Sequence, residues 1–143
     1  MKILSIVFIL FAQTAFGQTK TGTVIVEVKN FKKAQGNIML SIYKTEDGFP
    51  DKPEKAFKKF IVPIKSNTFE YTISDMSEGT YAIAIIHDEN ANGQMETNFI
   101  GIPKEGIGTS NNAKGNFGPP KFDDAKFTFA GESKKITINL VYL

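Results

Sequence analysis

The chain has 143 residues, 17 basic and 15 acidic side chains, a formal net charge of +2 and no cysteine. This balance disfavours a nucleic-acid partner, because such proteins usually carry a concentrated basic face. The absence of cysteine excludes disulfides, thiolate metal sites and a lipid anchor on a processed cysteine. The fold must therefore hold by packing, with or without a metal ion.

The first residues have the three regions of a secretory signal peptide. Lys2 supplies the positive start, residues 3–11 are an apolar run, and Ala15 and Gly17 are the small residues before a cleavage point at Gln18. The apolar run is too short to remain as a helix across a bilayer. We therefore expect an exported protein, periplasmic or extracellular, with no transmembrane segment in its mature form.

One domain is expected after this segment. If residues 1–17 are a signal peptide, residues 18–143 remain, which is close to the common size of a domain with its own core. The alternative is that the apolar N-terminal residues form a buried helix or strand.

Hydrophobic residues recur with a period of two, which is typical of half-buried β-strands. Val24, Val26 and Val28, for example, share one face of the first expected strand. Seven strands are predicted, over residues 23–29, 37–43, 57–65, 69–73, 81–87, 124–129 and 136–140. Pro63 places the third at a sheet edge, since proline cannot donate to a ladder. The fifth is apolar on both faces and should be central.

Short turn sequences join several of these strands. Turn residues at 33–36, 65–67 and 131–133 predict tight antiparallel hairpins. Seven strands connected in this way predict an all-β fold, an antiparallel β-sandwich of the immunoglobulin-like or transthyretin-like kind. A closed barrel is the main architectural alternative.

The alternation stops in residues 88–122, a segment rich in glycine, asparagine and proline. A loop of this length inside a compact domain is usually either functional or disordered. Its apolar side chains favour an ordered excursion that packs over one end of the sandwich. These side chains are Phe99, Ile100, Ile102, Ile107, Phe117 and Phe122.

The excursion opens with oxygen-bearing side chains at every second position, a spacing typical of calcium-binding loops. The candidate ligands are Asp88, Asn90, Asn92, Gln94 (through its backbone carbonyl) and Glu96, with Asn98 or Glu105 as a further ligand. Gly93, at position six, allows the sharp turn. Position 12 is Phe99 in place of a bidentate glutamate, so weak binding of Ca²⁺ is expected. The alternative is a plain turn, because Asn, Asp and Gly also favour left-handed geometry.

No catalytic site is predicted, and we expect the protein not to be an enzyme. His87, the only histidine, should point to the opposite face of its strand from Asp88. A structural role is therefore favoured over acid–base catalysis, which needs convergent partners. The neighbouring Asp123 and Asp124 also point apart on an extended chain and indicate a turn.

Several segments together resemble the bacterial family called domain of unknown function 2141. They are residues 79–82, 87–93 (His-Asp-Glu-Asn-Ala-Asn-Gly), 98–106, 108–112 and 118–125, and the similarity extends from Gly22 to Leu143. The family consists of small exported bacterial proteins, many from Bacteroidetes-like species, without an assigned activity. The resemblance implies export and a β-sandwich, and no substrate. Members commonly have aspartate where this chain has Glu96, which keeps an oxygen ligand but lengthens its reach.

Two functions are consistent with these features. The first is a non-catalytic binding module of the bacterial cell envelope, whose excursion is ordered by calcium and contacts an envelope protein or a glycan. The second is a structural or accessory envelope domain in which the loop is only a rigid lid.

Overall fold

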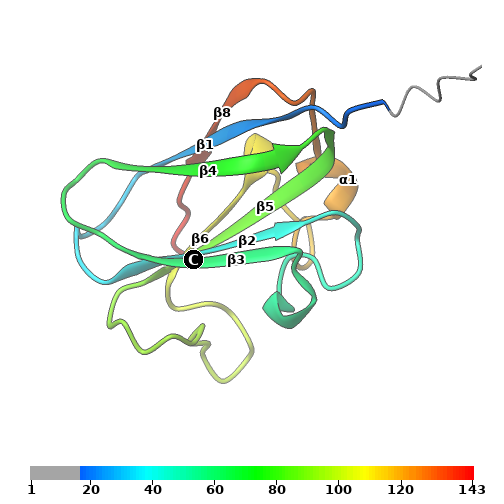
Figure 1. The fold of residues 1–143 in the computed structure, drawn as a ribbon. Coiled ribbons are helices and arrows are strands. Elements are labelled where there is room, and N and C mark those ends of the chain that lie inside the picture. Colours follow the sequence, from blue (N-terminus) through cyan, green and yellow to red (C-terminus); the bar gives the residue numbers. More distant parts are fainter. Residues whose placement is uncertain (1–16) are drawn as a thin grey trace, which may run out of the picture.

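The computed structural model describes residues 17–143, and it places two β-sheets face to face (Figure 1). The strands are β1 Thr21–Lys29, β2 Asn37–Tyr43, β3 Lys58–Pro63, β4 Phe69–Ser77, β5 Gly79–Asp88, β6 Gly106–Thr109, β7 Phe127–Phe129 and β8 Ser133–Asn139. Short helical turns occur at η1 Pro53–Lys55, η2 Ser110–Asn112 and α1 Phe122–Ala125. The predicted all-β sandwich is confirmed.

The smaller sheet has the order β4-β1-β8, and the larger has the order β3-β2-β5-β6, with β7 also paired to β5. β1 and β8 run parallel, and the other strand pairs are antiparallel. β3 lies at an edge, as Pro63 predicts. β5 lies between β2 and the β6 and β7 strands, and residues 81–85 are all buried, so the prediction of a central strand is also confirmed.

The hydrophobic core lies between the two sheets. Val24, Val26 and Val28 on β1 are at most 1% exposed and belong to one buried cluster with Ile38 and Leu40 on β2. Burying each side chain of this size stabilises the fold by roughly 1.5–3 kcal/mol relative to leaving it exposed. The period-two pattern therefore identifies the inner face of both sheets.

The three turns at 33–36, 65–67 and 131–133 are not hairpins, so that prediction is wrong. Each carries the chain from one sheet to the other, joining β1 to β2, β3 to β4 and β7 to β8. Turn residues specify a reversal of the chain, but they do not specify whether the next strand pairs with the previous one or packs across from it. β4 and β5 are also in different sheets, and Tyr81 closes that corner by donating to the carbonyl oxygen of Ser77 at 2.8 Å.

The segment 88–122 is not a single excursion over one end of the sandwich. It contains β6, which pairs with the last part of β5, and it is thereby divided into two loops, residues 89–105 and residues 113–121. The second loop leads to α1 and β7, beside the first residues of β5. The prediction that the six apolar residues are buried is wrong for four of them, which are exposed: Phe99, Ile100, Ile102 and Phe117. The strand predicted at 124–129 begins only at Phe127, because α1 occupies residues 122–125.

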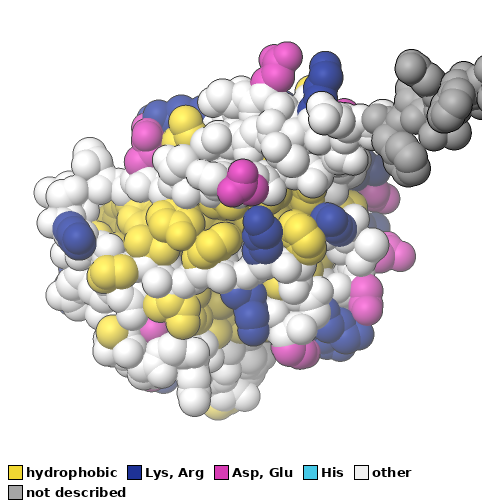
Figure 2. All heavy atoms as spheres, viewed as in Figure 1, with side chains coloured by type: hydrophobic (Ala, Val, Ile, Leu, Met, Phe, Trp, Pro, Cys, Tyr) yellow, Lys and Arg dark blue, Asp and Glu magenta, His cyan; other side chains and the backbone are white. Residues whose placement is uncertain are grey.

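Edge strands β3 and β4 lie on the same side of the sandwich (Figure 1). Figure 2 shows hydrophobic side chains along the seam between the two layers on this side, with basic residues interspersed. Phe57 and Ile61 are 45% and 62% exposed, and the ammonium of Lys44 lies 3.8 Å from the Phe57 ring centroid. Lys58 and Lys59 lie on the edge strand β3, where lysines discourage pairing with another chain.

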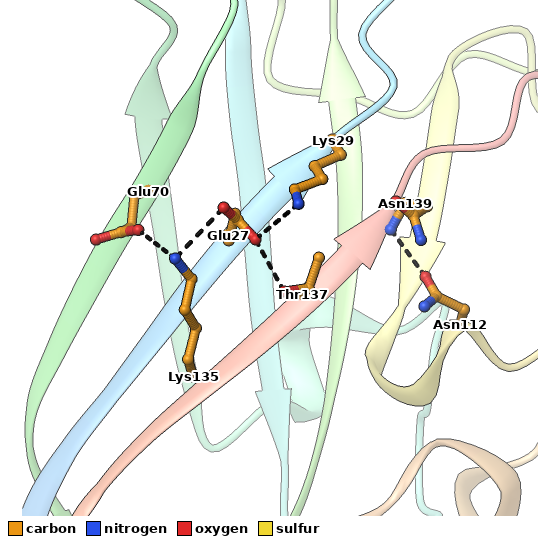
Figure 3. Close-up of polar contacts among 7 residues, drawn as sticks. All are labelled: Glu27, Lys29, Glu70, Asn112, Lys135, Thr137 and Asn139. Atoms are coloured by element: carbon orange, nitrogen blue, oxygen red, sulfur yellow. Dashed lines mark hydrogen bonds and ion pairs between the residues drawn. The ribbon is translucent and has the colours of Figure 1, made fainter.

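A polar network covers the outer face of the smaller sheet (Figure 3). The Thr137 hydroxyl donates to Glu27 at 2.9 Å, and Lys135 joins Glu27 (3.3 Å) to Glu70 (2.8 Å). Lys29 lies 3.3 Å from Glu27. The Thr137 hydrogen bond is the main cause that lowers the pKa of Glu27, followed by the two lysines, while burial acts in the opposite direction.

In the part of the chain that the structure describes, no helix has the length and apolar character to cross a membrane. The predicted signal peptide, residues 1–17, lies outside the described residues except for Gly17.

Candidate metal centre

The central strand β5 ends in two fully buried polar residues, His87 and Asp88. His87 Nε2 lies 2.8 Å from the Gln35 carbonyl oxygen, and Nδ1 lies 2.7 Å from the Tyr142 hydroxyl. A carbonyl only accepts, so Nε2 carries a hydrogen, and in the neutral ring Nδ1 then accepts from Tyr142. The Tyr142 oxygen in turn accepts from the backbone N–H of Lys32 at 3.1 Å. Both ring nitrogens therefore serve the packing of β5 against its neighbours.

Asp88 organises the start of the loop that follows β5. Its Oδ1 accepts from the backbone N–H of Asn92 at 3.1 Å, and its Oδ2 accepts from that of Gly93 at 2.8 Å. Ala91 and Gly93 have positive φ angles of 56° and 76°, which turn the chain back over the carboxylate. A buried carboxylate is costly unless hydrogen bonds or a cation compensate it, and here two N–H groups do so in part.

Asn90, Asn92 and Glu96 meet at one point of this loop. The amide nitrogens of Asn90 and Asn92 lie 3.1 and 3.0 Å from the same oxygen, Glu96 Oε1. Their amide oxygens accept from the backbone N–H groups of Asn92 and Gln94. Rotating either amide by half a turn would place an oxygen, a suitable calcium ligand, beside the Glu96 carboxylate, but it would also break the hydrogen bond from the backbone N–H.

Glu105 lies next to Asp88 across the pairing of β5 and β6, because His87 pairs with Gly106. Its side chain is only 4% exposed. Oε2 accepts from the backbone N–H of Glu96 at 3.3 Å, whereas Oε1 is buried without a hydrogen-bond partner.

Burial raises the pKa of Glu105, and the negative charges of Asp88 and Glu96 raise it further. The N–H groups of Glu96 and Glu89 act in the opposite direction, but only that of Glu96 forms a hydrogen bond. The ion pairs within residues 17–143 include none of these three carboxylates. The negative charge of the centre is therefore uncompensated by any basic side chain among the described residues.

The predicted ligands differ in how closely they gather. Asp88 is buried and contacts the loop through backbone N–H groups, whereas the exposed side chains of Asn90, Asn92 and Glu96 contact one another. Gln94 is exposed, and the side-chain oxygen of Asn98 belongs to a separate turn, where it accepts from Ile100 and Ile102. Within residues 17–143, no three His, Cys, Asp or Glu side chains are close enough together to hold a metal on their own. A cation here would depend on amide and backbone oxygens as well as carboxylates.

A separate depression of about 370 Å³ lies in the second loop, away from this centre, and is lined by residues including Lys114, Phe117 and Lys121. It is an open hollow beside residues 114–119, without buried titratable groups.

The sequence model of a bacterial family, described as an uncharacterized protein conserved in bacteria (DUF2141), matches residues 26–137. The chain belongs to this family. The match runs from β1 into β8 and includes every candidate ligand, although it is shorter than the similarity from Gly22 to Leu143 that the sequence motifs suggested. No curated protein and no solved structure matches the chain.

In this DUF2141 domain, sequence reasoning gave Glu105 only as one of two further candidates. Its importance depends on β6, which was not predicted because Gly-Ile-Gly-Thr contains a single apolar side chain. The two glycines mark close packing: a Cβ at Gly106 would lie 2.6 Å from the Tyr142 ring, and one at Gly108 would lie 2.6 Å from Ile138. The alternation of Gly106 and Gly108 with Ile107 and Thr109 is the local signal for this strand.

Proposed function

We propose that this DUF2141 domain is a non-catalytic, calcium-dependent binding module of the bacterial cell envelope. The ion would draw the carboxylates of Asp88, Glu96 and Glu105 closer together than they lie in the structure, and oxygens of Asn90 and Asn92 would complete its ligands. The observation that carries the proposal is the pair of buried carboxylates at Asp88 and Glu105, adjacent across two strands, with one oxygen lacking any donor.

Two buried negative charges at neighbouring positions repel each other, and burial raises the free energy of each. A proton on one of them, or a cation between them, relieves both effects. Calcium fits this centre because it takes six to eight oxygen ligands in flexible geometry, including amides and backbone carbonyls. The few charged ligands are suited to the weak sites of extracellular proteins, whose Kd values are about 10⁻⁴–10⁻³ M.

The proposal includes export, since the segment at residues 1–17 has the composition of a signal peptide and extracellular calcium is abundant enough for a weak site. The ion would hold residues 89–105 in one shape, and that loop would then contact a partner at the envelope.

A structural role for the loop is the second candidate. It is favoured by the hydrogen bonds from Asn92 and Gly93 to Asp88, which already close the turn without an ion. In that case the loop is a rigid lid, and calcium would leave the stability of the domain unchanged.

Calcium titration of the purified protein, followed by calorimetry and by thermal unfolding, tests the proposal. We expect one ion per chain and an unfolding midpoint that rises with calcium; at 100 times Kd the stabilisation would be about 2.7 kcal/mol. Asn92→Ala should weaken binding, whereas Asn116→Ala, an exposed asparagine in the second loop, should not. A midpoint that is the same in calcium and in chelator would exclude the calcium role and leave the structural one.

A further inference from the structure

Residues 97–103 form a small closed turn in the loop after β5, which we call the apolar turn. Thr97 and Pro103 form a β-bridge at its base. Asn98 closes it: its N–H donates to the Ile102 carbonyl at 2.8 Å, and its side-chain oxygen accepts from the N–H groups of Ile100 (3.0 Å) and Ile102 (2.9 Å). The backbone of the apolar turn is therefore ordered before any partner arrives.

The apolar turn presents hydrophobic side chains to solvent. Phe99 is 99% exposed and Ile100 is 64% exposed, and Ile102 and Met95 at its base are 38% and 36% exposed. In Figure 1 the segment between β5 and β6 projects away from the body of the sandwich. Adjacent exposed apolar residues on a projecting, ordered turn are typical of a contact with another protein or with a membrane.

The size and shape of the apolar turn favour a membrane. A stable protein interface buries about 800 Å² on each partner, whereas a phenylalanine side chain supplies only about 150–250 Å². Two prominent side chains at a convex tip are too few for the core of such an interface. They are enough for the shallow insertion by which apolar residues anchor a protein at the surface of a bilayer.

The charges beside the apolar turn make such a contact dependent on a cation. Residues 88–105 contain four carboxylates and one basic residue, Lys104. A bound calcium ion would be the largest local charge and would offset most of this negative charge. We propose that the apolar turn inserts into a bilayer with anionic headgroups when the neighbouring centre holds calcium. The calcium dependence of this inference rests on the proposed function.

Co-sedimentation of the full chain with lipid vesicles tests the inference. The vesicles contain phosphatidylglycerol and phosphatidylethanolamine. Binding is measured in chelator and in about 2 mM calcium, which is above the Kd expected for a weak site. We expect binding in calcium and none in chelator. Phe99→Ser should lower the partition coefficient about tenfold, since it removes the burial of one aromatic side chain. Phe117→Ser is the matched control, because Phe117 is just as exposed but lies in the second loop.

Absence of vesicle binding in calcium would overturn the inference, as would undiminished binding of Phe99→Ser or an equal loss in Phe117→Ser. Binding that persists in chelator would contradict the calcium dependence. Binding to envelope membranes but not to vesicles of their extracted lipids would indicate a protein or glycan partner in place of the bilayer. The thermal shift with calcium is measured on the same samples: a shift without vesicle binding overturns only the membrane contact, whereas no shift overturns the proposed function itself.

Discussion

The Tyr142 hydroxyl donates to Nδ1 of the buried His87 at 2.7 Å, across 55 positions of sequence. It also accepts from the backbone N–H of Lys32. The second residue from the C-terminus thus ties the end of the central strand to the connection between the two sheets. This network adjoins the start of the candidate metal loop along the chain, because Asp88 follows His87.

Tyr142→Phe should lower the free energy of unfolding by about 1–3 kcal/mol, because it leaves a buried histidine nitrogen without its donor. Urea unfolding measures the change. Tyr71→Phe is the control, since Tyr71 is also partly buried and its hydroxyl has no hydrogen bond within residues 17–143. Equal losses in the two variants would contradict a specific role for the Tyr142 hydroxyl.

The hydrogen bond from Thr137 to Glu27 should give a pH-dependent contribution to stability. The pKa of Glu27 is lowered from 4.5 in the folded protein, with Thr137 as the main cause (Figure 3). A lowered pKa means that the contribution is present above pH 4.5 and is lost as the pH falls through the folded-state value. Thr137→Val should therefore destabilise the protein at pH 7 and less so at pH 3, as measured by urea midpoints. Thr72→Val, an exposed threonine on β4, should show no such change; a pH-independent loss in Thr137→Val would refute the linkage.

Gly36 and Gly93 have the same backbone φ of 76° but different surroundings. A Cβ at Gly36 would collide with the carbonyl oxygen of Asp88, whereas nothing lies within 4 Å of a Cβ at Gly93. Gly93→Ala should cost about 1–2 kcal/mol, the penalty of a left-handed backbone, and Gly36→Ala clearly more. Chemical unfolding of both variants separates the steric clash from the backbone penalty. Equal losses would show that the turn at Gly36 can move away from β5.

Much of the fold follows from the sequence because an alternating pattern reports directly on a two-faced strand. β2 has the bounds 37–43 that its alternation predicts, and the apolar residues of β5 mark it as central. The pairing of strands is a different matter. The turns at 33–36 and 65–67 connect opposite sheets, and the parallel neighbours β1 and β8 are far apart in the chain, so no local pattern encodes their arrangement.

The candidate centre was predictable in part for the same reason. Oxygens at alternate positions after Asp88 are visible in the sequence, and the contacts of Asn90 and Asn92 with Glu96 follow from that spacing. The position of Glu105 beside Asp88 depends on the register of β5 and β6, which the glycines of β6 hide. The prediction that Phe99 is buried rests on its apolar character alone. It is wrong because no local rule indicates which apolar residue a fold leaves in solvent.

The central claim is that the buried carboxylates of Asp88 and Glu105 form the base of a cation site. The most direct test measures the free energy of unfolding of the wild type and of Glu105→Gln, each in calcium and in chelator, with Glu89→Gln as a control for the net charge of the loop. In chelator, the account predicts that Glu105→Gln is at least as stable as the wild type, because an unpaired buried charge is removed. In calcium, it predicts that the wild type and Glu89→Gln gain stability and that Glu105→Gln does not. A Glu105→Gln protein that is less stable in chelator and still responds to calcium like the wild type would contradict it.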